Sequence, residues 1–235
     1  MTPPSEPSES LVIPAYNEEN RIRQFLESIT GFRGEIIVVC DGTDRTAGVV
    51  LDVARRRSDL SIRCLNFDHR LGKGGGVIAG LAEAKGSVVG YVDADGSTSI
   101  SEMLRLFTHL TGADGAIGSR WVDGATMTVR QGFLRLAESR CFNLLIRLLF
   151  GLTYHDTQCG AKVFKKEAVD AVLPHMIARG FEFDVELLWR MKQGGFQVVE
   201  VPIEWQNKGD SRVRKRDMIR MLLGLFSVRF GRGRT

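Results

Sequence analysis

With 235 residues, 43% of them hydrophobic and 26% charged, the chain has the composition of a globular protein that can bury its core as one domain. Its four cysteines lack Cys-x-x-Cys spacing, which argues against a disulfide framework or a zinc site and favours a reducing compartment. The chain has no run of about 18 apolar residues, so a transmembrane helix is not expected. Its net charge is +4, and it carries no motif of a nucleic-acid-binding protein.

Apolar strands alternate with helical patterns along the first half of the chain. Residues 1–9 are polar, lack the basic and apolar regions of a signal peptide, and predict a disordered lead-in. Strands are then expected at residues 11–15, 35–40, 60–65, 88–92 and 115–119, and helices at residues 18–29, 46–57, 74–84 and 100–110. Repeated β–α units predict an α/β fold with a mostly parallel sheet and helices on both faces.

The second half of the chain is less regular. Helices are expected at residues 133–150, 181–193 and 216–230, and a strand at residues 196–204. The last 28 residues hold nine Lys or Arg and two Asp, so they carry +7 and residues 1–207 carry −3 of the net +4. We expect one domain over residues 10–207, and a basic amphipathic helix or tail over residues 208–235 that packs on the domain or on a membrane surface.

Two carboxylates one residue apart, Asp93 and Asp95, follow the apolar run at residues 88–92. In an open α/β sheet, ligands bind beyond the carboxyl ends of the strands, where this pair would lie. Carboxylate oxygens are ligands for Mg²⁺ or Mn²⁺, and these ions in turn hold diphosphates. Because Asp and Gly also favour turns, the pair alone is a weak signal.

Other strands of the expected sheet are also followed by polar loops. The loops at residues 14–19, 41–46 and 118–120 would emerge at the same edge as the carboxylate pair, because parallel strands end together. They add further carboxylates, a tyrosine suited to stacking and an arginine suited to phosphate. The glycines of residues 70–76 (RLGKGGG) either expose N–H groups to an anion at a helix start or form a turn that requires positive φ.

Seven blocks in this order resemble the family 2 glycosyltransferases of the GT-A fold, in particular the dolichyl-phosphate glucosyltransferases and mannosyltransferases. The blocks are VIPAYNEE (12–19), DGTD (41–44), GKGG (72–75), DAD (93–95), GSR (118–120), DTQCG (156–160) and FDVE (183–186). The resemblance implies a Rossmann-like GT-A domain that transfers a hexose with inversion, using Mg²⁺ or Mn²⁺. The donor would be a nucleotide sugar (UDP-glucose or GDP-mannose) and the acceptor a polyprenyl or dolichyl phosphate.

The resemblance also implies roles for individual residues. Residues that would contact the nucleotide sugar lie in the strand-end loops, the glycine-rich loop and the late basic segment: Pro14, Ala15, Tyr16, Glu18, Asp41, Lys73, Asp93, Ala94, Asp95 and Arg212. Asp93 and Asp95 would hold the metal ion together with the diphosphate. Of the two, Asp95 is the one expected to contact the metal directly. Arg120, Arg135 and Ser139 would bind the acceptor phosphate. The residues expected to carry the reaction are Asp95, Asp156, Arg120 and Arg135.

The role of Asp156 depends on the acceptor. A phosphate monoester has a second pKa of about 6, so it is already anionic near pH 7 and requires cations rather than a general base. A sugar hydroxyl would require a carboxylate base, for which Asp156 is the candidate. Asp156 would alternatively orient another group, or cap a turn or helix.

Other functions are weighed against this one. A family 2 transferase acting on a hydroxyl of a saccharide or small molecule is the main alternative. A sugar nucleotidyltransferase would carry a glycine-rich first loop, where this chain has Pro14-Ala15-Tyr16-Asn17-Glu18. We expect no nucleic-acid partner, and a cytoplasmic protein bound peripherally to the cytoplasmic face of a membrane; the oligomeric state is left open.

Overall fold

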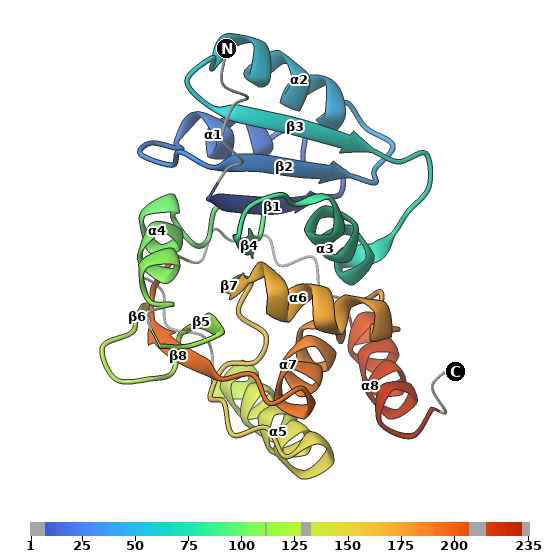
Figure 1. Ribbon diagram of the computed structural model, residues 1–235. Helices are drawn as coiled ribbons and strands as arrows, with labels where there is room; N and C mark the ends of the chain where they lie inside the picture. The colour runs from blue at the N-terminus through green and yellow to red at the C-terminus, as the bar shows by residue number, and fades with distance from the viewer. Residues whose placement is uncertain (1–7, 111, 128–132, 207–214, 232–235) are drawn as a thin grey trace.

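A seven-stranded sheet forms the centre of the computed structural model, which describes residues 8–110, 112–127, 133–206 and 215–231 (Figure 1). In order across the sheet, its strands are β3 (Ser61–Asn66), β2 (Glu35–Cys40), β1 (Glu9–Ala15), β4 (Val88–Val92), β7 (Ala161–Lys165), β5 (Gly115–Ser119) and β8 (Val198–Pro202). β7 runs antiparallel to its neighbours β4 and β5, whereas the other pairs are parallel. The predicted α/β fold with a mostly parallel sheet is confirmed.

Helices cover both faces of the sheet, and each face has its own apolar core. One face is covered by α1 (Ile22–Glu27), α2 (Thr46–Arg56) and α4 (Ile100–Thr108). The other is covered by α3 (Gly72–Glu83), α5 (Phe133–Phe150), α6 (Lys166–Val172), α7 (Phe183–Gln193) and α8 (Lys215–Phe230). In Figure 1, α4 lies to the left of the sheet, and α3, α6 and α8 lie to its right. Strands such as β2 are buried along their whole length because they are covered from both sides.

Several elements of the structure differ from the sequence-based expectation. β7 and α6, with the short 3₁₀ helix Leu173–His175, lie in a segment for which no element was predicted. The strand expected at residues 196–204 is divided into β8 and β9 (Glu204–Trp205), and β9 pairs with β6 (Thr126–Met127) in a second sheet. Pro202, which lacks an N–H, ends β8.

The first helix is shorter than expected and begins at Ile22. The carbonyl oxygen of Glu18 accepts hydrogen bonds from the N–H groups of both Arg21 and Ile22, which forms a turn in place of the first helical residues. Asn17 has a φ of 54°, so the chain changes direction directly after β1. The segment between β1 and α1 is therefore a loop at the edge of the sheet.

Candidate active site

The carboxyl ends of β1, β2, β4 and β5 lie at one edge of the sheet. This follows from the pairing, because β1 is parallel to β2 and β4, and β7 is antiparallel to both β4 and β5. Side chains connect the loops that follow these strands, as in the hydrogen bonds from Thr43 and Asp44 N–H to Asn17 Oδ1. The structure thus brings the predicted site loops together.

Asp93 and Asp95 follow β4 but have different surroundings. Asp93 Oδ1 and Oδ2 lie 2.8 and 3.1 Å from Nζ of Lys73, so an ion pair occupies both oxygens. Asp95 Oδ1 accepts the Ser97 N–H at 2.8 Å, and among the described residues its Oδ2 has no protein partner. Burial alone would lower the pKa of Lys73, but the neighbouring carboxylates, Asp93 foremost, raise it above its ordinary value. Lys73 therefore stays charged. Asp95 Oδ2, which has no protein partner among the described residues, can bind a cation.

Two carboxylates are few ligands for a divalent cation. Among the described residues, no cluster of three or more His, Cys, Asp or Glu side chains could hold a metal ion. Carboxylate oxygens suit Mg²⁺ and Mn²⁺, and Mg²⁺ commonly binds through one or two carboxylates together with substrate phosphates. The residues at this edge therefore fit a metal ion whose remaining ligands come from a diphosphate.

Asp41 orients the glycine-rich loop. Its Oδ2 accepts N–H groups from Leu71 and Gly72 at 2.9 and 3.1 Å, and the carboxylate is buried. The N–H groups of Gly74 and Gly75 donate to carbonyl oxygens of residues 180 and 179. Of the two interpretations of this loop, the structure therefore favours the turn, because these N–H groups are bonded within the protein.

The glycines of this loop also allow close packing. Gly72 has a φ of 79°, which other residues rarely adopt. A Cβ on Gly74 would lie 2.5 Å from Cβ of Phe183, so α3 lies against α7 only because that atom is missing. What the loop adds to the edge is the side chain of Lys73.

The first loop, after β1, contributes an aromatic ring and a buried carboxylate. The guanidinium of Arg70 lies 4.0 Å from the ring centre of Tyr16, a cation–π contact. Glu18 is buried, and its carboxylate is bound by Arg21 at 2.8 and 2.9 Å. Pro14 is half-buried and Ala15 is buried at the end of β1. The ligand-binding role expected for Tyr16 remains a prediction, whereas Glu18 holds the turn before α1.

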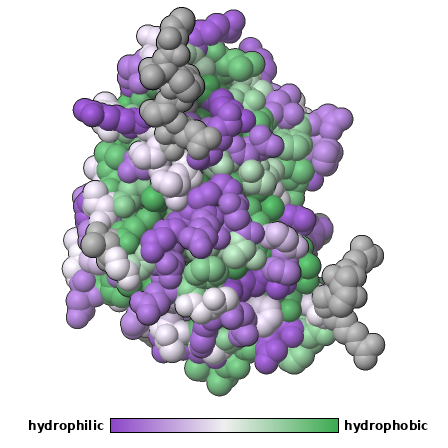
Figure 2. Space-filling model, in the orientation of Figure 1, coloured by the Kyte–Doolittle hydropathy of each residue, from purple (hydrophilic) through white to green (hydrophobic). Residues whose placement is uncertain are grey.

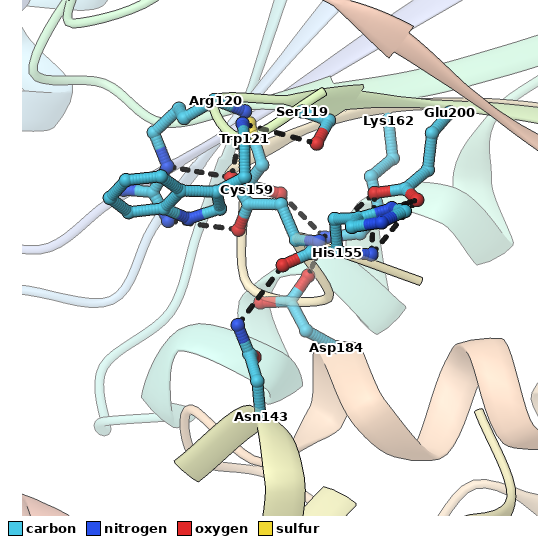
Figure 3. Close-up of polar contacts among 10 residues, drawn as sticks. Ser119, Arg120, Trp121, Asn143, His155, Cys159, Lys162, Asp184 and Glu200 are labelled. Carbon is cyan, nitrogen blue, oxygen red and sulfur yellow. Dashed lines mark hydrogen bonds and ion pairs between the residues drawn. The ribbon is translucent and has the colours of Figure 1, made fainter. Parts of the chain in front are cut away.

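Arg120, which directly follows β5, forms an ion pair with the buried Asp156 (Figure 3 labels Arg120). Arg120 Nε and Nη2 donate to the two Asp156 oxygens at 2.7 and 2.9 Å, and the Arg120 N–H donates to Oδ2 at 3.1 Å. Burial by itself would raise the pKa of Asp156, but the charge and hydrogen bonds of Arg120 hold it below its ordinary value. A carboxylate with a lowered pKa and both oxygens bonded is a poor base, so the geometry favours the orienting role of Asp156.

Glu200 on β8 fixes the turn that carries Asp156, a role that was not predicted from the sequence. Its oxygens accept the N–H of Asp156 at 2.9 Å, and the N–H and Nδ1 of His155 (Figure 3). A strand was predicted at residues 196–204, but the pattern does not show what Glu200 contacts. A carboxylate on an otherwise apolar strand face was the available signal.

A second buried network was also missed. Lys162 on β7 is fully buried and forms an ion pair with Asp184 of α7, while Tyr91 on β4 donates its hydroxyl to Asp184 at 2.5 Å (Figure 3 shows Lys162 and Asp184). Asp184 belongs to the FDVE block, but no role followed from the sequence. The burial of Lys162 could not be predicted, because the strand that carries it was not predicted.

Some predicted residues cannot be placed in the site. Arg212 lies outside the described residues. Arg135 and Ser139 lie on α5, but their side chains lie outside the described part of the structure. Ala94 is buried between the two carboxylates. The expectations for Arg135, Ser139 and Arg212 remain predictions.

Comparisons with known proteins point to one family. The model of glycosyl transferase family 2 matches residues 10–173. Glycosyltransferase AglD of Haloferax volcanii is 34% identical over 229 residues, which cover 93% of this chain and 36% of that protein. Dolichyl-phosphate beta-glucosyltransferase ALG5C of Trichomonas vaginalis is 34% identical over 247 residues, which cover 96% of this chain and 72% of that protein. The chain thus spans about a third of the length of AglD and about seven tenths of ALG5C.

A solved structure shares the fold. Glucosyl-3-phosphoglycerate synthase from Mycobacterium tuberculosis, in complex with Mn²⁺, UDP and glucosyl-3-phosphoglycerate, superposes with a TM-score of 0.68 at 18% identity. The superposition covers 95% of this chain and 80% of that chain, and it confirms the predicted GT-A fold. The family match runs from β1 to the end of α6 and includes the Asp93/Asp95 pair, and on this ground the chain belongs to glycosyl transferase family 2.

Proposed function

We propose that this chain transfers a hexose, with inversion, from a nucleotide sugar to the phosphate of a polyprenyl or dolichyl phosphate, and that it uses Mg²⁺ or Mn²⁺. The observation that carries the proposal is the meeting of the Asp93/Asp95 pair with the buried Arg120–Asp156 pair at one edge of a family 2 fold. The similarity to a dolichyl-phosphate glucosyltransferase over 96% of the chain supports the choice of acceptor.

The loop after β4 would bind the nucleotide-sugar donor. Breaking the glycosidic bond leaves negative charge on the nucleoside diphosphate, and fixed cations at the site stabilise that charge as it develops. A divalent ion held by Asp95 and Asp93 would supply Lewis-acid stabilisation of this leaving group. Lys73 adds a permanent positive charge beside the same carboxylates. Tyr16, held under Arg70, offers a ring face for stacking of the nucleotide base.

Arg120 would bind the phosphate of the acceptor. A phosphate acceptor needs no base, which agrees with a site where Arg120 occupies both oxygens of Asp156. Asp156 fixes the guanidinium plane, and the backbone of Asp156 is in turn fixed by Glu200. Such a held guanidinium is pre-oriented for a phosphate that approaches its remaining N–H groups. Arg135 and Ser139, one helical turn apart on α5, are proposed to complete the phosphate site.

A donor screen by calorimetry tests the first half of this proposal. UDP-glucose, GDP-mannose, UDP-N-acetylglucosamine and UDP-galactose are titrated with Mg²⁺, with Mn²⁺ and with EDTA. We expect one donor to bind only when the metal is present. Equal binding in EDTA would contradict the role given to Asp93 and Asp95.

Acceptor tests with the donor so identified separate the two glycosyltransferase alternatives. Transfer is measured to a polyprenyl phosphate, to the matching polyprenol without phosphate, and to free saccharides. We expect product only from the phosphate, because Arg120 supplies a cation and, among the described residues, it occupies both oxygens of the candidate base Asp156. Transfer to a hydroxyl acceptor, with none to the phosphate, would support the alternative.

Helix α8 provides the proposed contact with the membrane. Met221, Leu225 and Val228 are buried against the domain, whereas Ile219, Leu223, Phe226 and Phe230 are between 45 and 66% exposed and recur at helical spacing on another face. Leu144 and Leu148 of α5 are also exposed, and Arg229 of α8 donates to the Leu149 carbonyl of α5. Figure 2 shows hydrophobic side chains at the lower edge of the molecule, where Figure 1 places α5.

The charge around this face fits an anionic lipid surface. Exposed Arg220 and Arg229 flank the apolar stripe of α8, and Arg147 lies on α5. None of the described helices has both the length and the apolar character to cross a bilayer. Peripheral attachment, with the apolar stripe in the interface and the arginines at the lipid head groups, is the mode we propose, on the cytoplasmic face of a membrane.

Flotation with liposomes that contain anionic lipid tests this attachment. The variant Leu223→Glu/Phe226→Glu should lose flotation by at least about tenfold, because burial of each side chain is worth about 1.5–3 kcal/mol. The matched control is Leu51→Glu on α2, where a leucine is equally exposed (51%) outside this face. Unchanged flotation of the α8 variant, or equal loss in the control, would contradict the proposal.

A further inference from the structure

Lys162, a lysine with no exposed surface, lies on β7, the strand next to β4, which leads to the carboxylate pair. The ammonium group of Lys162 contacts Asp184 and donates to the carbonyl oxygen of Cys159, and Tyr91, its register partner on β4, donates to the same Asp184 oxygen (Figure 3 shows Lys162, Asp184 and Cys159). A buried charge is costly unless it is paired, and apolar replacement of a whole buried pair often leaves a protein equally stable. Stability alone therefore does not explain why an ion pair stands here.

Lys162 reaches the donor site through the backbone of the DTQCG block. The carbonyl that it binds belongs to Cys159, and the next carbonyl, of Gly160, accepts the N–H of Asp93 at 3.0 Å. A Cβ on Gly160 would lie 2.0 Å from Asp93 Oδ2, so the carboxylate rests directly on this corner. A shift of residues 159–160 would displace Asp93.

Lys162 also reaches the site through charge. Lys73 forms its ion pair with Asp93, and the carboxylates of Asp184 and Asp95 also attract its charge. In the structure Lys162 is paired with Asp184, and Lys73 is paired with Asp93. Without Lys162, Asp184 would be an uncompensated charge that competes with Asp93 for Lys73.

We propose that Lys162 is a positioning residue for donor binding: its contacts with Asp184 and with the Cys159 carbonyl keep Lys73 on Asp93, and so leave Asp95 available to the metal and diphosphate. This inference rests on the proposed nucleotide-sugar site and adds to it a residue that touches no substrate. Lys162 acts through Asp184 and the Cys159 carbonyl, and its position on β7, between β4 and β5, places it next to both.

Paired substitutions separate this role from a purely structural one. Lys162→Met alone leaves Asp184 unpaired and is expected to unfold more easily. Lys162→Met/Asp184→Asn removes both charges, yet keeps an acceptor for the Tyr91 hydroxyl, and should restore the melting temperature. The matched control is Lys165→Met/Asp114→Asn, which removes a lysine–aspartate pair from the other end of the same strand.

Calorimetry with UDP-glucose and GDP-mannose, over a series of Mn²⁺ concentrations, gives the readout. The folded Lys162→Met/Asp184→Asn variant should bind the donor about 10- to 100-fold more weakly and require more Mn²⁺, as when partners of metal ligands are lost. The control should bind like wild type. Wild-type affinity and Mn²⁺ dependence in the double variant would overturn the inference, as would a double variant that cannot fold. A wild-type protein that binds neither donor would instead overturn the proposed function, and this inference with it.

Discussion

Asp95→Asn should abolish metal-dependent donor binding and lower the rate of transfer by about 10²- to 10³-fold, or about 3–4 kcal/mol in barrier. The structure leaves Asp95 Oδ2 without a protein partner among the described residues, while Lys73 occupies both oxygens of Asp93. The asparagine keeps an oxygen to accept the Ser97 N–H, so the turn after β4 is preserved and only the charge is lost. Calorimetry with the identified donor, with and without Mn²⁺, measures the loss.

The matched control for this variant is Asp123→Asn. Asp123 is an exposed carboxylate that follows β5, and its removal changes the net charge of the protein by the same amount. Equal loss of binding in both variants would mean that the effect is long-range electrostatics. Undiminished metal-dependent binding by the Asp95→Asn variant would refute the assignment of the metal site.

Arg120→Ala should both remove transfer to a lipid phosphate and destabilise the fold by about 3–5 kcal/mol, because it leaves Asp156 as an unpaired buried carboxylate. Asp156→Asn should cost less stability, since the amide still accepts one hydrogen bond from the guanidinium. Urea unfolding measures the stability, and transfer to polyprenyl phosphate measures the activity. Donor affinity should change less than transfer in either variant if Arg120 serves the acceptor.

The control is Arg56→Ala on α2, which breaks a solvent-exposed ion pair with Asp52 and should cost less than about 1 kcal/mol. A similar cost for Arg120 and Arg56 would show that the buried pair is no stronger than a surface pair. A folded Arg120→Ala enzyme with full transfer activity would exclude Arg120 from the acceptor site.

The stability given by Asp156 should depend on pH. Because its folded pKa lies below the unfolded value of about 3.9, the contribution is fully present above that value and is lost as the pH falls through the folded pKa. The stability difference between wild type and Asp156→Asn should therefore be constant from about pH 5 to 8 and shrink below about pH 4. Urea midpoints across this range measure it, and a difference that grows on acidification would contradict the pairing.

The regular half of the fold could be predicted because its signals are local. The apolar run before Asp93 and the alternation of strands and helices depend on residues close in sequence, and parallel strands must end at one edge. This rule predicted that Asp41, Asp93 and Arg120 meet at that edge, whereas Lys73 was expected there only from the family resemblance. β7 was not predicted, because its five residues belong to no β–α unit. Its antiparallel position between β4 and β5 depends on partners that are distant in sequence.

The sequence by itself determined the alternation of strands and helices in the first half of the chain, the chemistry of the loops at the strand ends and the family to which these blocks point. Only the tertiary structure decided how those side chains are used: that Arg120 is bound to Asp156, that Lys73 rests on Asp93 and that Lys162 lies behind them. The physical reason is the separation of the partners, since each of these ion pairs joins residues 20 to 36 positions apart. Strand register and burial, rather than local pattern, select one carboxylate for each cation.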